Sequence, residues 1–499
     1  MAASNDHQWH PVSPLAMIHH ALVFMRQLVG SNPGPMLGIL AGGYAFAQRS
    51  PVMTIATVIG LAIGGLCLVI LAWLRFRYRI LDHAIQVRQG IFKRQNLSLE
   101  FTRIQNVRIE TPLYLRPFGL ARLSIESAGS ASEEVQLPGI PAERARGLRN
   151  MALARSQAES DPESDSPSKS LEAGELLLTR KPSDLVIYGI SSPAILWGGA
   201  ILAPIMGAVM QRMEGDGERL EPLRSLLNRI PESIPEAWLI AGAVFFLLIL
   251  MTLFSIAMAL IRYHGYRLER DEDRYRLQAG LITQREQGLR QHRIQHVRLS
   301  QSLIARLFRR HHLTCHQMGM IAPDQADGAG NSLMAPALTP VEQRRLLAHL
   351  YPTLPWHDLR FSGVSWRYML PRAAFWGTVW LALMVAGLSD DMTAWILASG
   401  PAIPALVALN WRRQGWCLNG DHLILRGGLF GCHYSILAGF RSQTLRIHQT
   451  PLQRRARLAN LSIRLGSGRF LLPFIHWHTA ETLTDGLLYR METSRAPWL

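Results

Sequence analysis

The sequence has few lysines, few cysteines and few charged residues for its length. Only three of its 52 basic residues are lysines, so arginine carries almost all of the formal net charge of +16. An arginine bias can come from genome composition as well as from selection for phosphate binding, and both explanations stay open. The four cysteines, at positions 67, 315, 417 and 432, show no CxxC spacing. This pattern argues against a disulfide framework and fits a reduced compartment.

Motifs that carry catalysis are also missing. The chain has no GxSxG element and no glycine-rich phosphate loop. Histidines 292, 296, 311, 312 and 316 form the densest cluster of metal-binding residue types, but no carboxylate or second cysteine stands at a suitable spacing. We interpret them as solvated or partly buried histidines of a basic domain. The sequence therefore predicts no metal, no cofactor and no enzyme.

Apolar stretches, in contrast, are abundant. Hydrophobic residues make up 48% of the chain and charged residues 18%, which is apolar for a soluble protein of this size. Residues 52–74 hold no charge and can cross a bilayer as a helix, whereas 15–30 fits an interfacial helix. Six spans in three hairpins are predicted, at 36–47 with 52–74, 185–210 with 237–261, and 373–388 with 392–411. Their centres hold essentially no Asp, Glu or Lys, which argues against a proton-coupled transporter.

One stretch recurs three times between these hairpins, at residues 90–125, 280–315 and 428–463. The second copy follows the first at an offset of 190 residues, and the third at 338 with a one-residue slip. The polar members of its Arg-Ile-Gln-x-Val-Arg-Ile motif are Arg103, Gln105 and Arg108, then Arg293, Gln295 and Arg298, then Arg441, Gln443 and Arg446. The long, uneven spacing indicates three copies of one small domain rather than a solenoid.

Each copy has the pattern of strands followed by a helix. Leu97, Leu99 and Phe101 alternate with polar residues, which predicts a half-buried strand. Ile104 and Val107 are three apart, so we expect a corner at the motif with Ile104 turned inward. We predict that the arginine and glutamine side chains bind backbone carbonyls at this corner, and ligand binding is the alternative. A helix is expected to close each copy, near residues 142, 340 and 480.

A Tyr-Arg strand, a glycine opening the next strand, the R-I-Q-x-V-R-I corner and a closing helix together resemble the bacterial pleckstrin-homology-like (PH-like) domain of YdbT-type membrane proteins. The resemblance covers nearly the whole chain. It implies small α+β domains, each a bent antiparallel sheet capped by a C-terminal helix, alternating with membrane hairpins. It also implies a scaffold or accessory role in the envelope, for example in the response to envelope stress or in tolerance to antimicrobial peptides. The resemblance further implies a smaller one-domain partner protein of the same family.

The expected domain order follows from the hairpins and the repeat. It is an interfacial helix with hairpin one (1–74), PH-like domain one (75–155), an acidic serine-rich linker (156–183), hairpin two (184–261), domain two (262–350), hairpin three (351–411) and domain three (412–499). Arginines follow each hairpin, at positions 75, 77 and 79, 262 and 267, and 412 and 413. By the positive-inside rule we expect a multi-pass protein of the bacterial inner membrane with all three domains in the cytoplasm.

The charge of the domains indicates what they bind. Residues 75–155, 262–350 and 411–495 carry net charges of +7, +6 and +8, and a cation near an anionic leaflet contributes about 1 kcal/mol. The same charges also serve as topology determinants and solubilising surface. The sequence shows no aromatic platform on which bases could stack, so we do not expect nucleic-acid binding. Our leading hypothesis is a non-enzymatic membrane scaffold whose domains bind anionic lipid headgroups, each other or a partner; the alternative is a component of a transport or channel complex. Because the domains are tethered close together, we expect them to pack through strand edges or apolar contacts.

Overall fold

The computed structural model describes residues 8–19, 21–22, 51–81, 83–90, 94–101, 104–127, 135–158, 175–192, 236–271, 274–317, 332–356, 358–385, 397, 400–429 and 431–493. These residues form two compact units, which we describe separately. Unit one comprises residues 1–174 together with 276–278 and 282–288. Unit two comprises residues 175–275, 279–281 and 289–499. Unit one thus holds copy one of the repeat and part of a β-hairpin of copy two, formed by residues 276–278 and 282–288. Unit two holds the rest of copy two and copy three.

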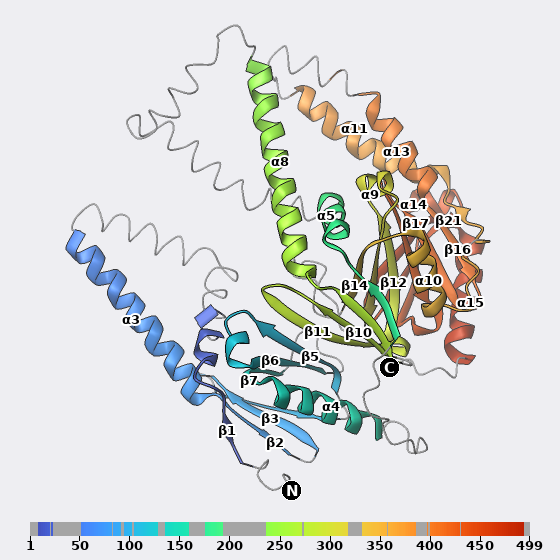
Figure 1. Ribbon diagram of the computed structural model, residues 1–499. Helices are drawn as coiled ribbons and strands as arrows, with labels where there is room; N and C mark the ends of the chain where they lie inside the picture. Colours follow the sequence, from blue (N-terminus) through green and yellow to red (C-terminus); the bar gives the residue numbers. More distant parts are fainter. Residues whose placement is uncertain are drawn as a thin grey trace. The chain divides into compact units, whose positions relative to one another are not determined.

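Copy one folds as two antiparallel sheets closed by a helix (Figure 1). The first sheet has the order β1-β2-β3-β4, and the second contains β7, β6 and β5 in that order. The strands are β1 (His10–Pro11), β2 (Arg77–Ile80), β3 (Ala84–Gln89), β4 (Gln95–Glu100), β5 (Ile104–Pro112), β6 (Leu120–Ser127) and β7 (Val135–Pro141), with η2 (Arg116–Phe118) between β5 and β6 and α4 (Ala142–Ala158) at the end. Alternate residues of both sheets, such as Ile85, Leu99 and Leu123, meet Leu148 of α4 in one core.

Copies two and three repeat this order of elements. Copy two has β8 (Glu175–Thr179), β9 (Arg267–Asp271), β10 (Arg274–Ala279), β11 (Thr283–Arg290), η3 (Gln291–Arg293), β12 (Ile294–Gln301), α9 (Leu303–Leu307), β13 (His311–Gln317), β14 (Ser332–Leu338) and α10 (Pro340–Leu350). Copy three has β15 (Ser362–Gly363), η4 (Trp366–Tyr368), β16 (Gly415–Asn419), β17 (His422–Gly427), β18 (Cys432–Ala438), η5 (Gly439–Arg441), β19 (Thr444–His448), α14 (Pro451–Arg455), β20 (Leu458–Leu465), β21 (Gly468–His476) and α15 (Trp477–Thr493). The three expected α+β domains with closing helices are therefore confirmed.

The strand register confirms the repeat offsets of 190 and 338 residues. Val107 faces Ile125 in copy one, Val297 faces Cys315 in copy two, and Leu445 faces Ile463 in copy three, and these are equivalent pairs. The expected corner is also present, as the short 3-10 turns η3 and η5. Ile104 and Ile294 are both buried after it. The corner lets each chain segment leave one sheet and enter the other without exposing its apolar face.

Each copy also includes a short strand that precedes its predicted hairpin. β1 pairs with β2, β8 with β9 and β15 with β16. The predicted boundaries are therefore wrong in two places: residues 175–179 belong to a sheet rather than to the 156–183 linker, and 362–363 belong to copy three rather than to the 351–411 hairpin. Val12 and Ala16, near the predicted interfacial helix, lie in the core of copy one. Strands of two to five residues are too short to show periodicity, which is why the sequence did not reveal them.

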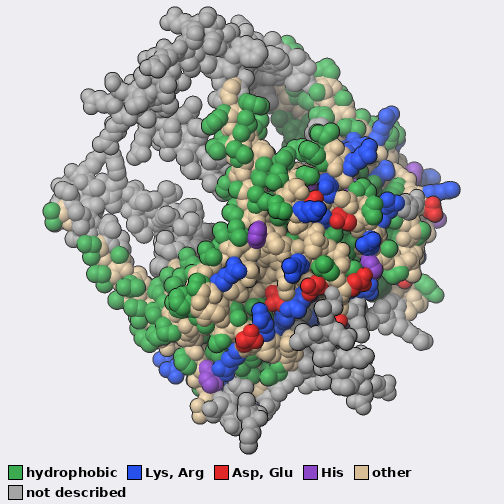
Figure 2. All heavy atoms as spheres, in the orientation of Figure 1, with side chains coloured by type: hydrophobic (Ala, Val, Ile, Leu, Met, Phe, Trp, Pro, Cys, Tyr) green, Lys and Arg blue, Asp and Glu red, His purple; other side chains and the backbone are tan. Residues whose placement is uncertain are grey.

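The helices predicted to enter the membrane are described in part. They are α3 (Pro51–Arg75), α5 (Pro182–Ser191), α8 (Glu236–Tyr263), α11 (Met369–Val385) and α13 (Ala402–Arg413). Within the described residues, one helix is long and apolar enough to cross a membrane, namely Phe245–Tyr263 of α8. Its mean hydropathy is 2.3, and 11% of its most apolar stretch is buried. Hydrophobic side chains run along α8 in Figure 2. Ala62–Arg75 of α3 is a shorter apolar helix, and the predicted span 36–47 lies outside the described residues.

Two predicted spans are not continuous helices. α5 ends at Ser191, and Ser192 is extended with φ −79° and ψ 144°, because the residue before a proline disfavours helical geometry. The predicted 185–210 span is therefore interrupted at its start. α13 begins at Ala402 after a turn at Gly400 and Pro401, so 392–411 is not one helix either. A proline fits the first turn of a helix but not its interior.

Candidate functional site

Arg441, the motif arginine of copy three, connects two copies of the repeat. Its side chain is 7% exposed and donates hydrogen bonds to the backbone carbonyls of His292 and Ile294. The bonding to carbonyls that we expected is present here, but the carbonyls belong to the corner of copy two rather than to the corner of Arg441 itself. A planar guanidinium has several fixed donors and can therefore hold two carbonyls at once.

The other motif residues of copies two and three do not converge on one site. Arg298, Gln443 and Arg446 are exposed. Gln295 is buried, and its Oε1 has no hydrogen-bond partner among the described residues. Burial lowers the pKa of Arg293, and the nearby Arg274 adds to this effect. The motif thus conserves a corner in the chain rather than a common ligand pocket.

In copy one, Arg108 is buried, with Nη1 4.0 Å from Oε1 of Glu110. Arg103 and the side chain of Gln105 lie outside the described residues. The predicted role of these two side chains at the corner therefore stays a prediction.

Copies two and three share one continuous sheet. β12 pairs with β18 antiparallel, with Val297 facing Ile436 and Leu299 facing Tyr434. The strand order is β14-β13-β12-β18-β17-β16-β15, so the second sheet of copy two continues into the first sheet of copy three. Val297 and Leu299 are at most 1% exposed. The expected strand-edge contact between domains is confirmed for this pair, and we call it the β12–β18 junction.

Unit one contains a second junction of the same kind, between β5 and β11. Ile109 faces Glu286 and Glu110 faces Arg285. Ile109 is the repeat equivalent of Leu299, and Glu286 is the equivalent of Tyr434, so the two junctions have the same register. The same two strands of the repeat therefore recognise each other twice.

Ion pairs follow the β5–β11 junction. Glu110 pairs with Arg122 and lies 3.8 Å from Nε of Arg285. Burial opposes ionisation of Glu110, but the three arginines around it outweigh burial and hold its pKa below the usual range. Glu286 pairs with Arg149 of α4 at 3.1 Å, and its pKa is lowered in the same way against the effect of burial. Strand pairing and charge pairing thus act together here.

His296 lies at the β12–β18 junction as a neutral, buried side chain. Its Nδ1 is 2.6 Å from Oγ of Ser467, and its ring stacks on His316 at 4.2 Å and meets Phe470 edge-on. Burial lowers the pKa of His296 to about 2, with His316 and Arg298 contributing. The described residues contain no group of three His, Cys, Asp or Glu side chains that could hold a metal ion. His296, with His316 stacked on it, thus packs copy two against copy three, whereas His312 contacts Ser191 and Tyr188 before copy two.

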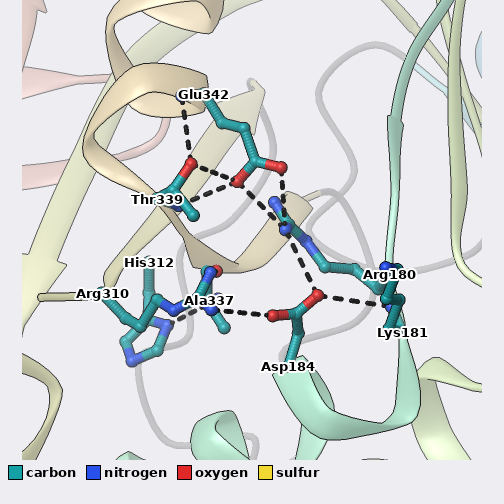
Figure 3. A network of polar contacts seen from close by, with 8 residues as sticks. All are labelled: Arg180, Lys181, Asp184, Arg310, His312, Ala337, Thr339 and Glu342. Atoms are coloured by element: carbon teal, nitrogen blue, oxygen red, sulfur yellow. Dashed lines mark hydrogen bonds and ion pairs between the residues drawn. The ribbon is translucent and has the colours of Figure 1, made fainter. Parts of the chain in front are cut away.

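Copy two has a buried ion network around Arg180 (Figure 3). Nη1 of Arg180 lies 3.1 Å from Oε2 of Glu342 and 3.9 Å from Oδ2 of Asp184, and Asp184 also pairs with Arg310 at 3.1 Å. Thr339 and Glu342 form a capping box at the start of α10. The network joins the segment that leads into hairpin two to the closing helix of copy two.

Copies one and three have apolar residues at the position of Arg180. Val12 and Val364 are the equivalents of Arg180, given the register of the three pre-hairpin strands, and both are buried. Nε1 of Trp73 donates to the Val12 carbonyl at 3.2 Å, and Nε1 of Trp411 donates to the Val364 carbonyl at 2.9 Å. Trp73 and Trp411 are equivalent residues at the ends of α3 and α13. Each tryptophan therefore links the end of the second predicted hairpin helix to the segment that leads into the same hairpin. The sequence analysis missed this link, although the two tryptophans stand at the repeat offset.

A basic pocket opens at the β12–β18 junction. Its volume is about 330 Å³, and its lining residues are Gln301, Arg306, His311, Arg413, Arg426, Cys432 and Tyr434. Arg413 closes α13 and donates to the carbonyls of Leu429 and Gly431. Arg426 donates to the carbonyl of Arg413 at 3.2 Å. The described residues of its lining include three arginines and no carboxylate, at the end of a helix predicted to leave the membrane, which suits an anionic group.

A short turn with exposed apolar residues stands beside this pocket and recurs in each copy. α9 and the residue that follows it expose Leu303, Leu307 and Phe308, and Arg306 and Arg309 are exposed among them. Oγ of Ser302, which caps α9, donates to the carbonyl of Ser191 at 2.8 Å, at the end of α5. The equivalent turns expose Leu113 and Phe118 in copy one and Leu452 in copy three. Apolar tips flanked by arginine are typical of surfaces that enter a membrane interface.

The comparisons with known proteins agree with this architecture. A family model described as "Bacterial PH domain" matches residues 36–156, 226–351 and 367–491. The UPF0699 transmembrane protein YdbT of Bacillus subtilis (strain 168) is 23% identical to the chain over 420 residues, which is 80% of this chain and 81% of the relative. The chain belongs to the bacterial PH domain family. With the exposed, apolar α8, it is a membrane protein that carries three bacterial PH domains.

Proposed function

We propose that the protein is a non-enzymatic scaffold of the cell membrane, whose PH domains are joined strand to strand on the cytoplasmic side and bind anionic lipid headgroups. The β5–β11 and β12–β18 junctions carry the scaffold part of this proposal, because a repeated register makes the pairing a property of the repeat rather than an accident of one contact. The arginines in the last turns of α3, α8 and α13 support the cytoplasmic side.

The lipid part of the proposal rests on the turn at α9 and the basic pocket. Arg306 lines the pocket and also lies on the exposed turn, so one surface offers cations to a headgroup and apolar side chains to the acyl region. The Ser302 bond to the carbonyl of Ser191 holds this turn where the chain enters predicted hairpin two. Headgroup phosphate and arginine then pair near the surface of the bilayer.

The test is lipid binding by the full chain purified in detergent. Changing Arg306 and Arg309 together to Gln should weaken binding of phosphatidylglycerol by about 2 kcal/mol, because each cation near the headgroups contributes about 1 kcal/mol. Native mass spectrometry with phosphatidylglycerol, and with phosphatidylcholine for comparison, measures this loss of affinity. The matched control is Arg344→Gln with Arg345→Gln, which removes two exposed arginines from α10 of the same copy. Equal losses in both variants would mean that only the total charge matters and would overturn a site at α9.

A further inference from the structure

Two strands of the repeat end their sheets with one edge open. β4 is the last strand of the order β1-β2-β3-β4, and β19 is the first of β19-β20-β21. Within the described residues β4 pairs only with β3 and β19 only with β20. By repeat position β4 is the equivalent of β11 and β18, and β19 is the equivalent of β5 and β12. The open edges are thus the two halves of the junction that forms twice within the chain.

The side chains of β19 show what the missing partner would cover. Val107 and Ile109 of β5, and Val297 and Leu299 of β12, are buried, whereas the equivalent Leu445 and Ile447 of β19 remain partly exposed. β4 is likewise more exposed along its length than β18, its counterpart in the β12–β18 junction. β19 therefore keeps in contact with water apolar side chains that β5 and β12 bury, and β4 keeps Leu97 half-exposed where β11 and β18 have the buried Gln287 and Ser435.

Neither open strand contains proline or lysine, two residues that block the edges of natural sheets. This holds for Gln95–Glu100 and for Thr444–His448. Other charged side chains can also protect an edge. Arg446 is a charge on β19, but its equivalents Arg108 and Arg298 stand in strands that pair on both sides. An arginine at this position is therefore compatible with pairing.

We propose that β19 of one molecule pairs with β4 of a second copy of this chain, forming a third junction of the same kind between molecules. The inference rests on the scaffold function proposed above. The register is fixed by the two junctions inside the chain: as Ile109 faces Glu286 and Leu299 faces Tyr434, Ile447 faces Asn96 of the second copy. Arg446 then faces Leu97, and no like charges oppose each other on the two strands.

Such a junction is head to tail, so it propagates. Each molecule keeps one open β4 and one open β19, and a heterologous contact of this kind forms a closed ring or an open row. Because strand addition satisfies backbone donors and acceptors that otherwise face water, it needs little side-chain specificity beyond the register. A membrane-anchored chain that propagates in this way would lay a ring or row of PH domains along the inner face of the bilayer.

The test is cysteine crosslinking at the expected register, in the full chain with Cys67, Cys315, Cys417 and Cys432 replaced by serine or alanine. One tagged chain carries Ile447→Cys, a differently tagged chain carries Asn96→Cys, and both are reconstituted together and treated with a short bismaleimide. We expect a crosslinked heterodimer of the two tags. Thr444→Cys in place of Ile447→Cys is the off-register control and should crosslink at least fivefold less.

Two further samples separate the possible failures. A single chain with Ser300→Cys and His433→Cys should crosslink within itself, because these half-buried residues face each other in the β12–β18 junction; failure there would overturn the scaffold arrangement itself. If this control succeeds and the two tagged chains do not crosslink, the second-copy junction is wrong while the scaffold stands. A chain that carries both Ile447→Cys and Asn96→Cys and crosslinks only with itself would show that the edges close within one molecule, which also overturns the proposal.

Discussion

The strands β12 and β19 are the same element of the repeat in two different surroundings. Both follow a 3-10 turn, pair with the next strand in the same register and carry the motif residues Val-Arg-Leu or Leu-Arg-Ile. β12 has a second neighbour, β18, and buries its apolar residues completely, whereas β19 leaves Leu445 and Ile447 partly exposed. The difference shows that a half-buried strand pattern defines one face and one neighbour, and that the other edge depends on which strand arrives there.

This comparison also separates two kinds of motif residue. Arg441 precedes β19 and is buried against carbonyls of copy two, while Arg446, within β19, is exposed. Arg441 therefore belongs to the contact of copy three with its predecessor. Arg446 is as exposed as its equivalent Arg298, although β12 has a second neighbour, so the exposure of this arginine does not depend on the junction.

The largest expected effect comes from truncating the apolar face of the two strands. Leu299→Ala should lower the free energy of unfolding by about 3 kcal/mol, because a fully buried leucine leaves a cavity when it is shortened. Ile447→Ala should cost about 1 kcal/mol in the dilute protein, since its side chain is only partly buried. Thermal unfolding of the detergent-purified chain measures both, and equal losses would contradict the assigned difference in burial.

A smaller effect is expected from the two arginines. Arg441→Ala should cost about 2 kcal/mol, because it leaves the carbonyls of His292 and Ile294 without their charged donor. Arg446→Ala should change stability by less than about 0.5 kcal/mol, as for other exposed positions. Trypsin cleavage between copies two and three should accelerate in the first variant alone. Unchanged stability of Arg441→Ala with loss of lipid binding would instead assign Arg441 to a ligand site.

Much of this architecture could be predicted from the sequence because it depends on local pattern. Alternating Leu97, Leu99 and Phe101 indicate a strand, and Thr339 with Glu342 marks the start of α10 through a capping box. The repeat then multiplies each such signal by three, which is why the corner and the closing helices were predicted correctly.

The remainder depends on contacts between residues far apart in the sequence. β8 is recognised only through its pairing with β9, and the tryptophan links of Trp73 and Trp411 depend on where the hairpins return. Arg180 shows the limit most clearly: it stands where copies one and three have valine, and only the position of Glu342 and Asp184 around it explains how a charge is buried there. The site could not be derived from the motif, because equivalent motif residues face different neighbours in each copy.

The smallest expected effect is a pH dependence of the stability of the β12–β18 junction. His296 is buried against Ser467, and its pKa is lowered to about 2 by burial first and by His316 and Arg298 second. A histidine whose pKa is lower in the folded state than its unfolded value stabilises the fold fully above that unfolded value, and this contribution is lost as the pH falls through about 6.5 toward the folded pKa. At pH 6 the loss is about 0.8 kcal/mol for His296.

The repeat itself provides the matched variant for this prediction. His296→Asn installs the residue that copy one has at the equivalent position, Asn106, and keeps a hydrogen-bonding side chain without titration in this range. The β12–β18 junction of the wild-type protein should therefore become more sensitive to trypsin between pH 7 and pH 6, and the His296→Asn variant should show a weaker pH dependence. His312 and His316, whose pKa values burial lowers to about 4, contribute in both proteins and set the residual slope together with His311, His422 and His433, whose pKa values burial also lowers. If both proteins loosen equally with acid, His296 is not the group that couples the junction to pH.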